Sequence, residues 1–535
     1  MARRTRGVPP TFSRSCGIDL GGGGSMNGSD WDALGQRWWS HVRFLADDRL
    51  EGRETGSAGY EKAAVYVTEQ FRAVGLAPAG SNGYRQPVDF RVTRIDQPRS
   101  SLELLRDGTA RPVTLGEDAA IMAHFETVPA TEADTVFVGY GLRIPEWNYD
   151  DFAGLDLKGK IVVFVRGGPA SLPGPVKAHF QSLEERSETI RAVGAVGVVA
   201  IPNPTVPELP WSRLAAGIIL PRMQLNDPAP ESVPPPMTVA FNPDRAEMLF
   251  SGSGHTFQEI VAGLGKNDPL PRFPLAVRVR ARAVLTRGTA RCHNIAGVLP
   301  GSDPALGKEY VVVSAHLDHL GVGEPVDGDR VYHGAMDNAS GAASLVEIAR
   351  WMRESGARPR RSVLFLAVTG EEKGLLGSEH FATHPTVPGP MVANINLDQF
   401  LPLFPLKYLE VEGLDESSLG EDIRAVAGAR GVEAQPEYEP DRVLFIRSDQ
   451  YNFIKVGVPA LACSFGYVRG SAEEQRTKDW YHERYHGPAD NVDQPVDLAA
   501  AAQFNRLIET LVMRVADADR RPAWNPESFF KRFAR

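Results

Sequence analysis

Three apolar, strand-like runs in the chain each end in residue types that bind metal ions. The run EYVVVSA leads into His316, RSVLFLAVTG leads into Glu371 and Glu372, and ANINL leads into Asp398. Runs of this kind favour an α/β sheet with mostly parallel strands. In such a sheet, ligands and chemistry gather outside the carboxyl ends of the strands. The sequence therefore predicts one polar site at one edge of one sheet.

Two further candidates come from different local contexts. Asp337 lies at or just before the amino end of a helix predicted in GAMDNASGAASLVEIARWMRES, where a helix cap is the alternative role for it. His486 lies in the loop RYHGPADNVDQP, before an Ala-rich helix predicted to start near Val496. His482, four residues earlier, competes with His486, and the residues alone leave that choice open.

Together these candidates suit two ions that share one carboxylate: His316, Asp337, Glu372, Asp398 and His486. Zinc accepts imidazole nitrogen and carboxylate oxygen, and a catalytic zinc site leaves a position open for water. Two neighbouring ions can bind a substrate oxygen and activate a water together. Asp337 suits the bridge because a short side chain at a tight turn can reach both ions. The set points to hydrolysis.

The adjacent acids Glu371 and Glu372 can divide the work, because a carboxylate held on a metal cannot also take a proton from water. We assign Glu372 as a ligand and Glu371 as the general base. Asp318 follows His316 by two residues, so we expect its carboxylate to accept the other N–H of that imidazole and fix its tautomer. We interpret His319 as a bystander.

The motifs that carry these residues resemble those of the co-catalytic zinc peptidases of metallopeptidase family 28, in order and in context. They are HLDHLG, GAMDNASG, TGEEKGLLGS, NINLD and YHGPAD, within residues 290 to 495. That family includes leucyl-type aminopeptidases and aminopeptidase Y. The resemblance implies two Zn²⁺ ions per chain, although Co²⁺ or Mn²⁺ would satisfy the same ligands. It also favours His486 over His482 as the last ligand.

The resemblance further implies a role for each residue of the site. Glu371 would be the base, and Tyr485 resembles a tyrosine that stabilises the tetrahedral oxyanion in some members. The peptide bond Asp337–Asn338 is expected to be cis. The implied ligand sets are His316 and Asp398 for one ion, Glu372 and His486 for the other, and Asp337 for both.

Composition agrees with a large enzyme. With 535 residues, 42% of them apolar and 23% charged, the chain exceeds what one core usually holds, so we expect two domains. A net charge of -9 argues against a nucleic-acid surface. The sequence contains no run of 18 apolar residues, so we predict no membrane span. Cys16, Cys292 and Cys463 are widely separated, and they predict neither a disulfide framework nor a CxxC metal site. The oligomeric state is left open.

Residues 1–29 are predicted to be a disordered lead. They begin with basic residues, but Pro, Ser and Gly replace the apolar core that a signal peptide requires. Met26 is an alternative start. Without a recognisable signal peptide we expect a cytoplasmic protein by default, and a periplasmic or secreted one if the start is misassigned.

Residues 126–285 differ in amino-acid pattern from the rest of the chain. Strand-like TVFVGY, KIVVFV and VGVVAI alternate with turns, and ten of the forty residues from 201 to 240 are proline, which favours a separate module. It resembles a protease-associated domain, a β-rich insertion that such peptidases carry. We expect it to wall the active-site cleft and to restrict substrate size, with a passive spacer as the alternative. No catalytic residue is expected there.

The catalytic domain is then discontinuous, with residues 30–125 and 286–535. Its opening stretch predicts two amphipathic helices around a loop that contains Gly52 and Arg53, as in the resembled family. Further helices are predicted at 419–428 and 496–516. The expected fold is α/β, with a mixed, mostly parallel sheet sandwiched by helices and an inserted β-rich domain.

Three functions fit this sequence. The first is a zinc exopeptidase acting on peptides, with an aminopeptidase ahead of a carboxypeptidase or amidase on the same fold. The second is a glutaminyl cyclase-like acyltransferase, although those relatives use one zinc and normally lack the insertion. The third is a non-catalytic, receptor-like relative, although such relatives have lost ligands. The filled ligand set favours the exopeptidase.

Overall fold

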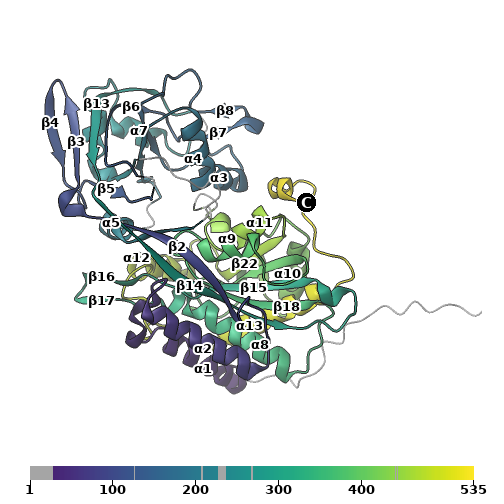
Figure 1. Ribbon diagram of the computed structural model, residues 1–535. Coiled ribbons are helices and arrows are strands. Elements are labelled where there is room, and N and C mark those ends of the chain that lie inside the picture. Colours follow the sequence, from purple (N-terminus) through teal and green to yellow (C-terminus); the bar gives the residue numbers. More distant parts are fainter. Residues whose placement is uncertain are drawn as a thin grey trace, which may run out of the picture.

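The computed structural model describes residues 28–125, 127–206, 209–226, 237–266, 269–439, 442 and 444–534. They form two regions, each built on its own large sheet (Figure 1). Most of the predicted lead at residues 1–29 lies outside the described residues. Its last two residues begin helix α1 (Gly28–Leu45).

The larger sheet has the strand order β11-β2-β14-β18-β15-β19-β22-β20-β21, with β1 beside β14. Strands β18, β15, β19 and β22 run parallel, and the outer pairs β14·β18 and β20·β22 are antiparallel. The predicted mixed sheet is confirmed. The strands are β1 (Ala77–Pro78), β2 (Arg85–Ile95), β11 (Arg222–Leu225), β14 (Leu285–Leu299), β15 (Tyr310–His316), β18 (Ser362–Val368), β19 (Met391–Asn396), β20 (Tyr408–Glu412), β21 (Glu433–Pro436) and β22 (Ala460–Gly466).

Helices cover both faces of this sheet (Figure 1). Alternate residues of a strand face opposite sides, and β15 shows the division. Val311 and Val313 pack into the core with α1 and with α2 (Ala58–Val74), α8 (Ser340–Glu354) and α13 (Leu498–Asp517). Val312 packs with Phe381 of α9 (Leu376–Thr383) and Phe453 of α11 (Gln450–Lys455). The helices α10 (Leu419–Gly428) and α13 confirm the two predicted late helices.

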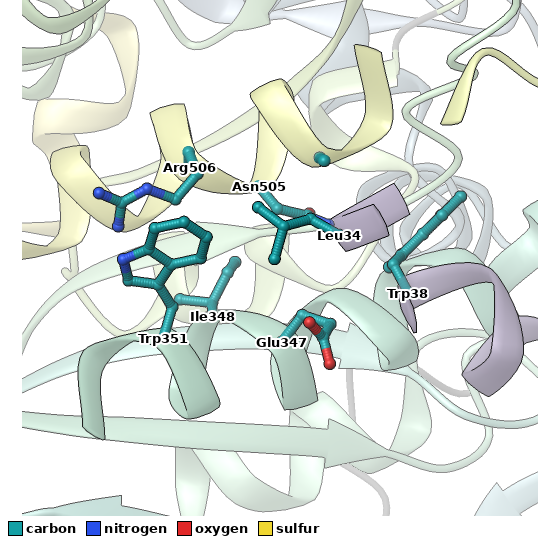
Figure 2. A pocket seen from close by; sticks show the side chains of 8 residues that line it. Leu34, Trp38, Glu347, Ile348, Trp351, Asn505 and Arg506 are labelled. Atoms are coloured by element: carbon teal, nitrogen blue, oxygen red, sulfur yellow. The ribbon is translucent and has the colours of Figure 1, made fainter. Parts of the chain in front are cut away.

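A small cavity of about 20 Å³ lies where α1, α8 and α13 meet, and Figure 2 shows the side chains around it. Trp38 on its wall donates a hydrogen bond from Nε1 to Ser344 Oγ at 3.1 Å. Arg506 lies over the ring of Trp351, 3.6 Å from the centroid. A space of this size holds about one water molecule, so this cavity is a packing feature of the helical layer.

The second sheet has the order β4-β3-β13-β6-β9-β10-β12-β5. It begins at Ser101, ahead of the predicted limit at residue 126, because β3 and β4 form a hairpin around Asp107–Gly108 and β3 pairs with β13. Within the predicted insertion, β11 instead pairs with β2 in the larger sheet. The strands are β3 (Ser101–Arg106), β4 (Thr109–Val113), β5 (Ala119–Met122), β6 (Ala130–Phe137), β9 (Ile161–Val165), β10 (Gly197–Ile201), β12 (Thr238–Phe241) and β13 (Phe273–Arg282).

A long antiparallel ribbon of β2 and β14 joins the two regions (Figure 1), with pairing from Leu285↔Ile95 to Ile295↔Arg85. Strand β14 begins at Leu285, so the ribbon starts at the edge of the second region. The regions also touch elsewhere. His179 Nδ1 on α3 (Gly174–Gln181) lies 2.9 Å from Tyr451 Oη.

A short hairpin of β16 (Gly321–Val326) and β17 (Asp329–Tyr332) follows β15 directly and was not predicted. It packs against the turn Asp48–Arg53 that precedes α2. Among the described helices, none has the length and apolar character needed to cross a lipid bilayer.

Candidate metal centre

The predicted ligands come together at the carboxyl edge of the larger sheet. His316 is the last residue of β15, while Asp398 and Glu372 lie just beyond the ends of β19 and β18. Asp337 lies in the turn Ala335–Ala339, directly before α8, and His486 follows α12 (Ala472–Glu483). Parallel strands bring the first three to one edge, and the helix start and the loop add the other two.

Four short distances define the cluster. His316 Nε2 lies 3.2 Å from Asp337 Oδ1 and 3.3 Å from Asp398 Oδ1. His486 Nε2 lies 3.2 Å from Asp337 Oδ2 and 3.3 Å from Glu372 Oε2. The two oxygens of Asp337 thus face different histidines, and each histidine faces one further carboxylate.

These separations suit ligands around a metal ion. Nitrogen and oxygen ligands about 2.0–2.1 Å from a tetrahedral zinc lie roughly 3.3 Å from one another. A direct charged hydrogen bond between the same groups is shorter, about 2.7–2.9 Å. Within the described residues, His316, Asp337 and Asp398 each offer one ligand atom in a group no wider than 4.8 Å. The donor types and spacings therefore fit zinc.

The charges of the site reinforce one another. Burial opposes a charge on His316, but the carboxylates of Asp398 and Glu371 and the contact with Asp337 together raise its pKa well above the usual value. Burial likewise opposes a charge on Asp337, yet its contacts with His316 and His486 hold its pKa well below the usual value. Both side chains are almost fully buried. The concentration of carboxylates makes this pocket favourable for cations.

Glu371 has a different environment from the ligand set. Burial raises its pKa well above the usual range, and repulsion from Glu372 and Asp398 adds to that effect while His316 opposes it. Its side chain is partly exposed and takes no part in the four short distances. A carboxylate that lies beside the ligands without being one of them is placed for general-base work.

Asp318 corrects one prediction, because its carboxylate does not contact His316. The Nδ1 of His316 instead lies 3.1 Å from the backbone oxygen of Asp318. The Asp318 carboxylate accepts hydrogen bonds from Thr55 Oγ1 at 2.8 Å and from the backbone N–H of Glu371 at 3.2 Å and Glu372 at 3.4 Å. The N–H groups of the turn after β18 engage the carboxylate, so the carbonyl is left for the imidazole. Asp318 thus orients the turn that carries both glutamates.

His319 is also not the bystander that the sequence indicated. Its Nδ1 lies 2.7 Å from Glu372 Oε1, and its side chain is fully buried. Glu372 therefore turns one oxygen to His319 and the other to His486. The signal was present in HLDHLG, since a turn directly after β15 brings a residue three positions beyond His316 back to the same site.

His486, and not His482, faces the cluster. His482 is exposed on the last turn of α12, and its carbonyl oxygen accepts a hydrogen bond from Arg213. The ring of Tyr485 stacks on the ring of His486, with centroids 3.9 Å apart. The predicted oxyanion tyrosine is therefore beside the site.

Arg53 is a residue whose part in the site the sequence did not assign. It is 0% exposed and donates hydrogen bonds to the backbone oxygens of Leu317 at 3.0 Å, His333 at 2.6 Å and Gly334 at 3.0 Å. One guanidinium thus joins the segment after His316 to the segment before Asp337. Its place in the loop LEGR was the available signal.

Two more supporting residues were missed. Ser448 Oγ donates a hydrogen bond to Asp398 Oδ2 at 2.6 Å. Asp490 accepts the backbone N–H of Asp337 at 3.0 Å. The Asp337–Asn338 peptide bond beside it is cis, as expected. Asp490 was visible within YHGPAD, whereas no motif pointed to Ser448.

An α/β sheet that gathers two histidines and three carboxylates at its carboxyl edge defines a zinc peptidase type of domain. Residues 294–512, which are less than half of the chain, match the family described as Peptidase family M28. All five predicted ligand positions fall within the matched residues, which are the part of the chain that carries the site.

Short stretches of the chain resemble curated proteins. A probable zinc metalloprotease of Pyrenophora tritici-repentis is 34% identical over 105 residues, which is 19% of this chain and 23% of that protein. A vacuolar membrane protease of Verticillium alfalfae is 35% identical over 85 residues, which is 16% of this chain and 8% of that protein. The chain thus matches less than a quarter of the length of these relatives.

The whole architecture has a solved counterpart. The structure of an aminopeptidase from Aneurinibacillus sp. strain AM-1 aligns with a TM-score of 0.53 over 93% of this chain and 97% of that chain, at 18% identity. At this identity the likeness shows a shared fold, which extends over both sheet regions.

Proposed function

We propose that the protein is a di-zinc exopeptidase, and specifically an aminopeptidase that removes N-terminal residues from peptides. The observation that carries this proposal is the position of Asp337, whose two oxygens face two different histidines at 3.2 Å. A shared carboxylate of this kind suits a pair of ions. The proposed ligands are His316 and Asp398 for one ion, Glu372 and His486 for the other, and Asp337 for both.

Zinc ions held by these residues would polarise the scissile carbonyl and lower the pKa of a water molecule. Glu371 takes a proton from the attacking water and delivers it to the leaving amine. Its backbone is fixed for this task by the hydrogen bond from its N–H to Asp318. Tyr485 donates its phenolic proton toward the developing oxyanion, and stacking on His486 limits the movement of its ring.

The second region is proposed to be a protease-associated domain that walls the cleft. Two contacts support this role, because both reach the region of the site from residues between 101 and 282. Arg213 bonds to carbonyl oxygens beside His486. His179 contacts Tyr451, which lies three residues after the Ser448 that holds Asp398.

The test is a zinc count per chain combined with assays on matched peptides whose amino terminus is free or blocked. Two ions, and chelator-sensitive release of amino acids from the free peptide alone, would support the proposal. Activity on blocked peptides alone would replace it with a carboxypeptidase or amidase. One ion together with cyclisation of N-terminal glutamine would replace it with an acyltransferase. Filled zinc sites without turnover on any of these substrates would replace it with a receptor-like protein.

A further inference from the structure

Helix α5 (Trp211–Ile219) belongs to the second region and lies close to α12 of the larger one (Figure 1). Its inner side packs on the second sheet, where Ala215 and Ile218 join Ala120 of β5 and Ala240 of β12 in one apolar cluster. The helix is therefore anchored to the second sheet, while its first turn projects toward the loop that carries His486.

Arg213, on that first turn, binds two backbone carbonyls of the larger region. Its Nη1 donates to the oxygen of Tyr485 at 2.9 Å, and its Nη2 donates to the oxygen of His482. Carbonyls at the end of a helix lack partners within the helix and carry partial negative charge. A planar guanidinium can bind two such oxygens at once. Arg213 is therefore a bidentate cap on the end of α12.

This cap acts next to a proposed metal ligand. The carbonyl carbon of Tyr485 is bonded to the nitrogen of His486, so the hydrogen bond lies one peptide bond from that residue. His486 has a left-handed backbone, with φ of 52°, which residues other than glycine adopt infrequently and which the surroundings must maintain. A Cβ placed on Gly487 would come within 3.6 Å of Arg213 Nη1, so the guanidinium also packs against the next residue.

The Arg213 guanidinium makes both of these contacts with backbone carbonyl oxygens. Partial burial lowers the pKa of Arg213 below its usual value. We infer that Arg213 is a positioning residue. Through it, the second region holds His486 in place as a ligand of the proposed ion whose other ligands are Glu372 and Asp337.

The inference rests on the proposed two-ion site, but it can fail separately. It is compatible with the expectation that residues 126–285 contain no catalytic residue, since Arg213 acts on the site through His486 without touching substrate. A spacer domain would not need to bond to the ligand loop.

The experiment measures zinc binding by competition with a chromophoric chelator for the wild type and for Arg213→Gln, Arg213→Lys and Arg213→Ala. Second-layer contacts typically change metal affinity by about 10- to 100-fold, so we expect Arg213→Gln to weaken one of the two ions by that factor and leave the other unchanged. Arg213→Lys should retain part of the affinity because an ammonium can still reach one carbonyl. Excess zinc should restore the activity of Arg213→Gln.

Arg245→Ala is the matched control, because Arg245 is an exposed arginine of the second region that pairs with Glu117, and it should bind both ions as the wild type does. Arg213→Gln keeps most of the side-chain volume, so it remains informative if Arg213→Ala fails to fold. Wild-type affinity for both ions in Arg213→Gln would overturn the inference and leave the di-zinc proposal intact. Equal weakening of both ions, or activity that zinc does not restore, would mean general destabilisation and would also overturn it. A wild-type protein that binds fewer than two ions would remove the proposed function itself.

Discussion

Both sheets contain a set of parallel strands, but they differ in the residue types just beyond the strand ends. In the larger sheet, β15 ends in His316, and the chain reaches Glu371 and Asp398 just beyond β18 and β19. In the second sheet, β6, β9, β10 and β12 are also parallel. Within three residues of their carboxyl ends, these strands are followed by one acid, Asp244 after β12, and by no histidine. Parallel strands occur in both sheets, so the residues at the strand ends, and not the topology, decide the chemistry.

Buried acids make the same contrast. Asp337, in the turn before α8, faces two histidines. Asp151 in the second region is equally buried, but it accepts hydrogen bonds from the Leu142 N–H at 3.0 Å and the Tyr149 hydroxyl at 2.8 Å. One acid is part of a site for cations, and the other braces a turn. Burial alone therefore does not identify a functional carboxylate.

The largest loss of zinc and of activity is expected from Asp337→Asn. An amide offers one neutral oxygen where the carboxylate offers two charged ones, so both ions should be lost. The metal contribution to transition-state stabilisation is several kcal/mol, so activity should fall on the order of 10³-fold or more. Zinc content by mass spectrometry and turnover on an aminoacyl chromogenic substrate measure the two consequences.

Asp151→Asn is the control for that variant. It should keep zinc and turnover while losing about 1–3 kcal/mol of stability, because a buried donor loses its acceptor. If Asp337→Asn retained both ions, the contrast between the two buried acids would be lost.

The next largest loss of activity is expected from Glu371→Gln, which removes a proton acceptor and leaves all five proposed ligands in place. Zinc content should stay at the wild-type value, while kcat should fall by about 10²- to 10⁴-fold. Glu132→Gln, in β6 of the second sheet beside Arg280, should change neither quantity. A Glu371→Gln enzyme at full rate would refute the assignment of the base.

The sequence predicted the parts of this site that depend on short stretches. His316 and Asp398 follow apolar strands, so their common edge could be expected from pattern alone. The partner of Asp318 could not, because it depends on N–H groups at Glu371 and Glu372, more than fifty residues later. Ser448 contacts Asp398 across a similar separation and carries no local signature.

The boundary between the two regions also depends on contacts between residues far apart in the sequence. The hairpin of β3 and β4 looked like part of the catalytic domain because nothing near Ser101 marks a boundary. Its assignment depends on pairing with β13, where the register Arg282↔Ser101 joins residues 181 positions apart. Long-range pairing of this kind is fixed by the whole fold, and a single sequence does not display it.

A third prediction concerns pH and the contact between the regions. Burial lowers the pKa of His179 to about 4, so the folded protein keeps this residue neutral where an unfolded chain, with a pKa of about 6.5, takes up a proton. Stability is therefore lost as the pH falls from about 6.5 toward 4. Between pH 7 and pH 5 the loss from this group is about 2 kcal/mol.

Urea unfolding of the wild type and His179→Gln at both pH values tests this expectation. The variant should show a smaller loss of stability on acidification than the wild type does. His255→Gln, at an exposed position of the second region, is the control and should behave as the wild type. An unchanged pH dependence in His179→Gln would mean that other groups control acid stability.

The smallest changes in stability and zinc affinity are expected when a single hydroxyl group is removed, and each region offers one to compare. Ser448 donates to Asp398 Oδ2 at 2.6 Å, and Thr135 in β6 donates to the Val277 backbone oxygen at 2.7 Å. Thr135→Val removes one buried hydrogen bond and should cost about 1 kcal/mol of stability. Ser448→Ala also removes the bond that Ser448 Oγ accepts from Asn396 Nδ2 at 2.9 Å, so it should cost about 1–2 kcal/mol. Only Ser448→Ala should weaken zinc binding, by about tenfold, because it frees a ligand carboxylate to rotate. Melting temperatures and chelator competition on the same samples separate the two quantities. Equal loss of zinc affinity in Thr135→Val would show that metal binding follows overall stability, and the distinction between the two sheets would then have no local cause.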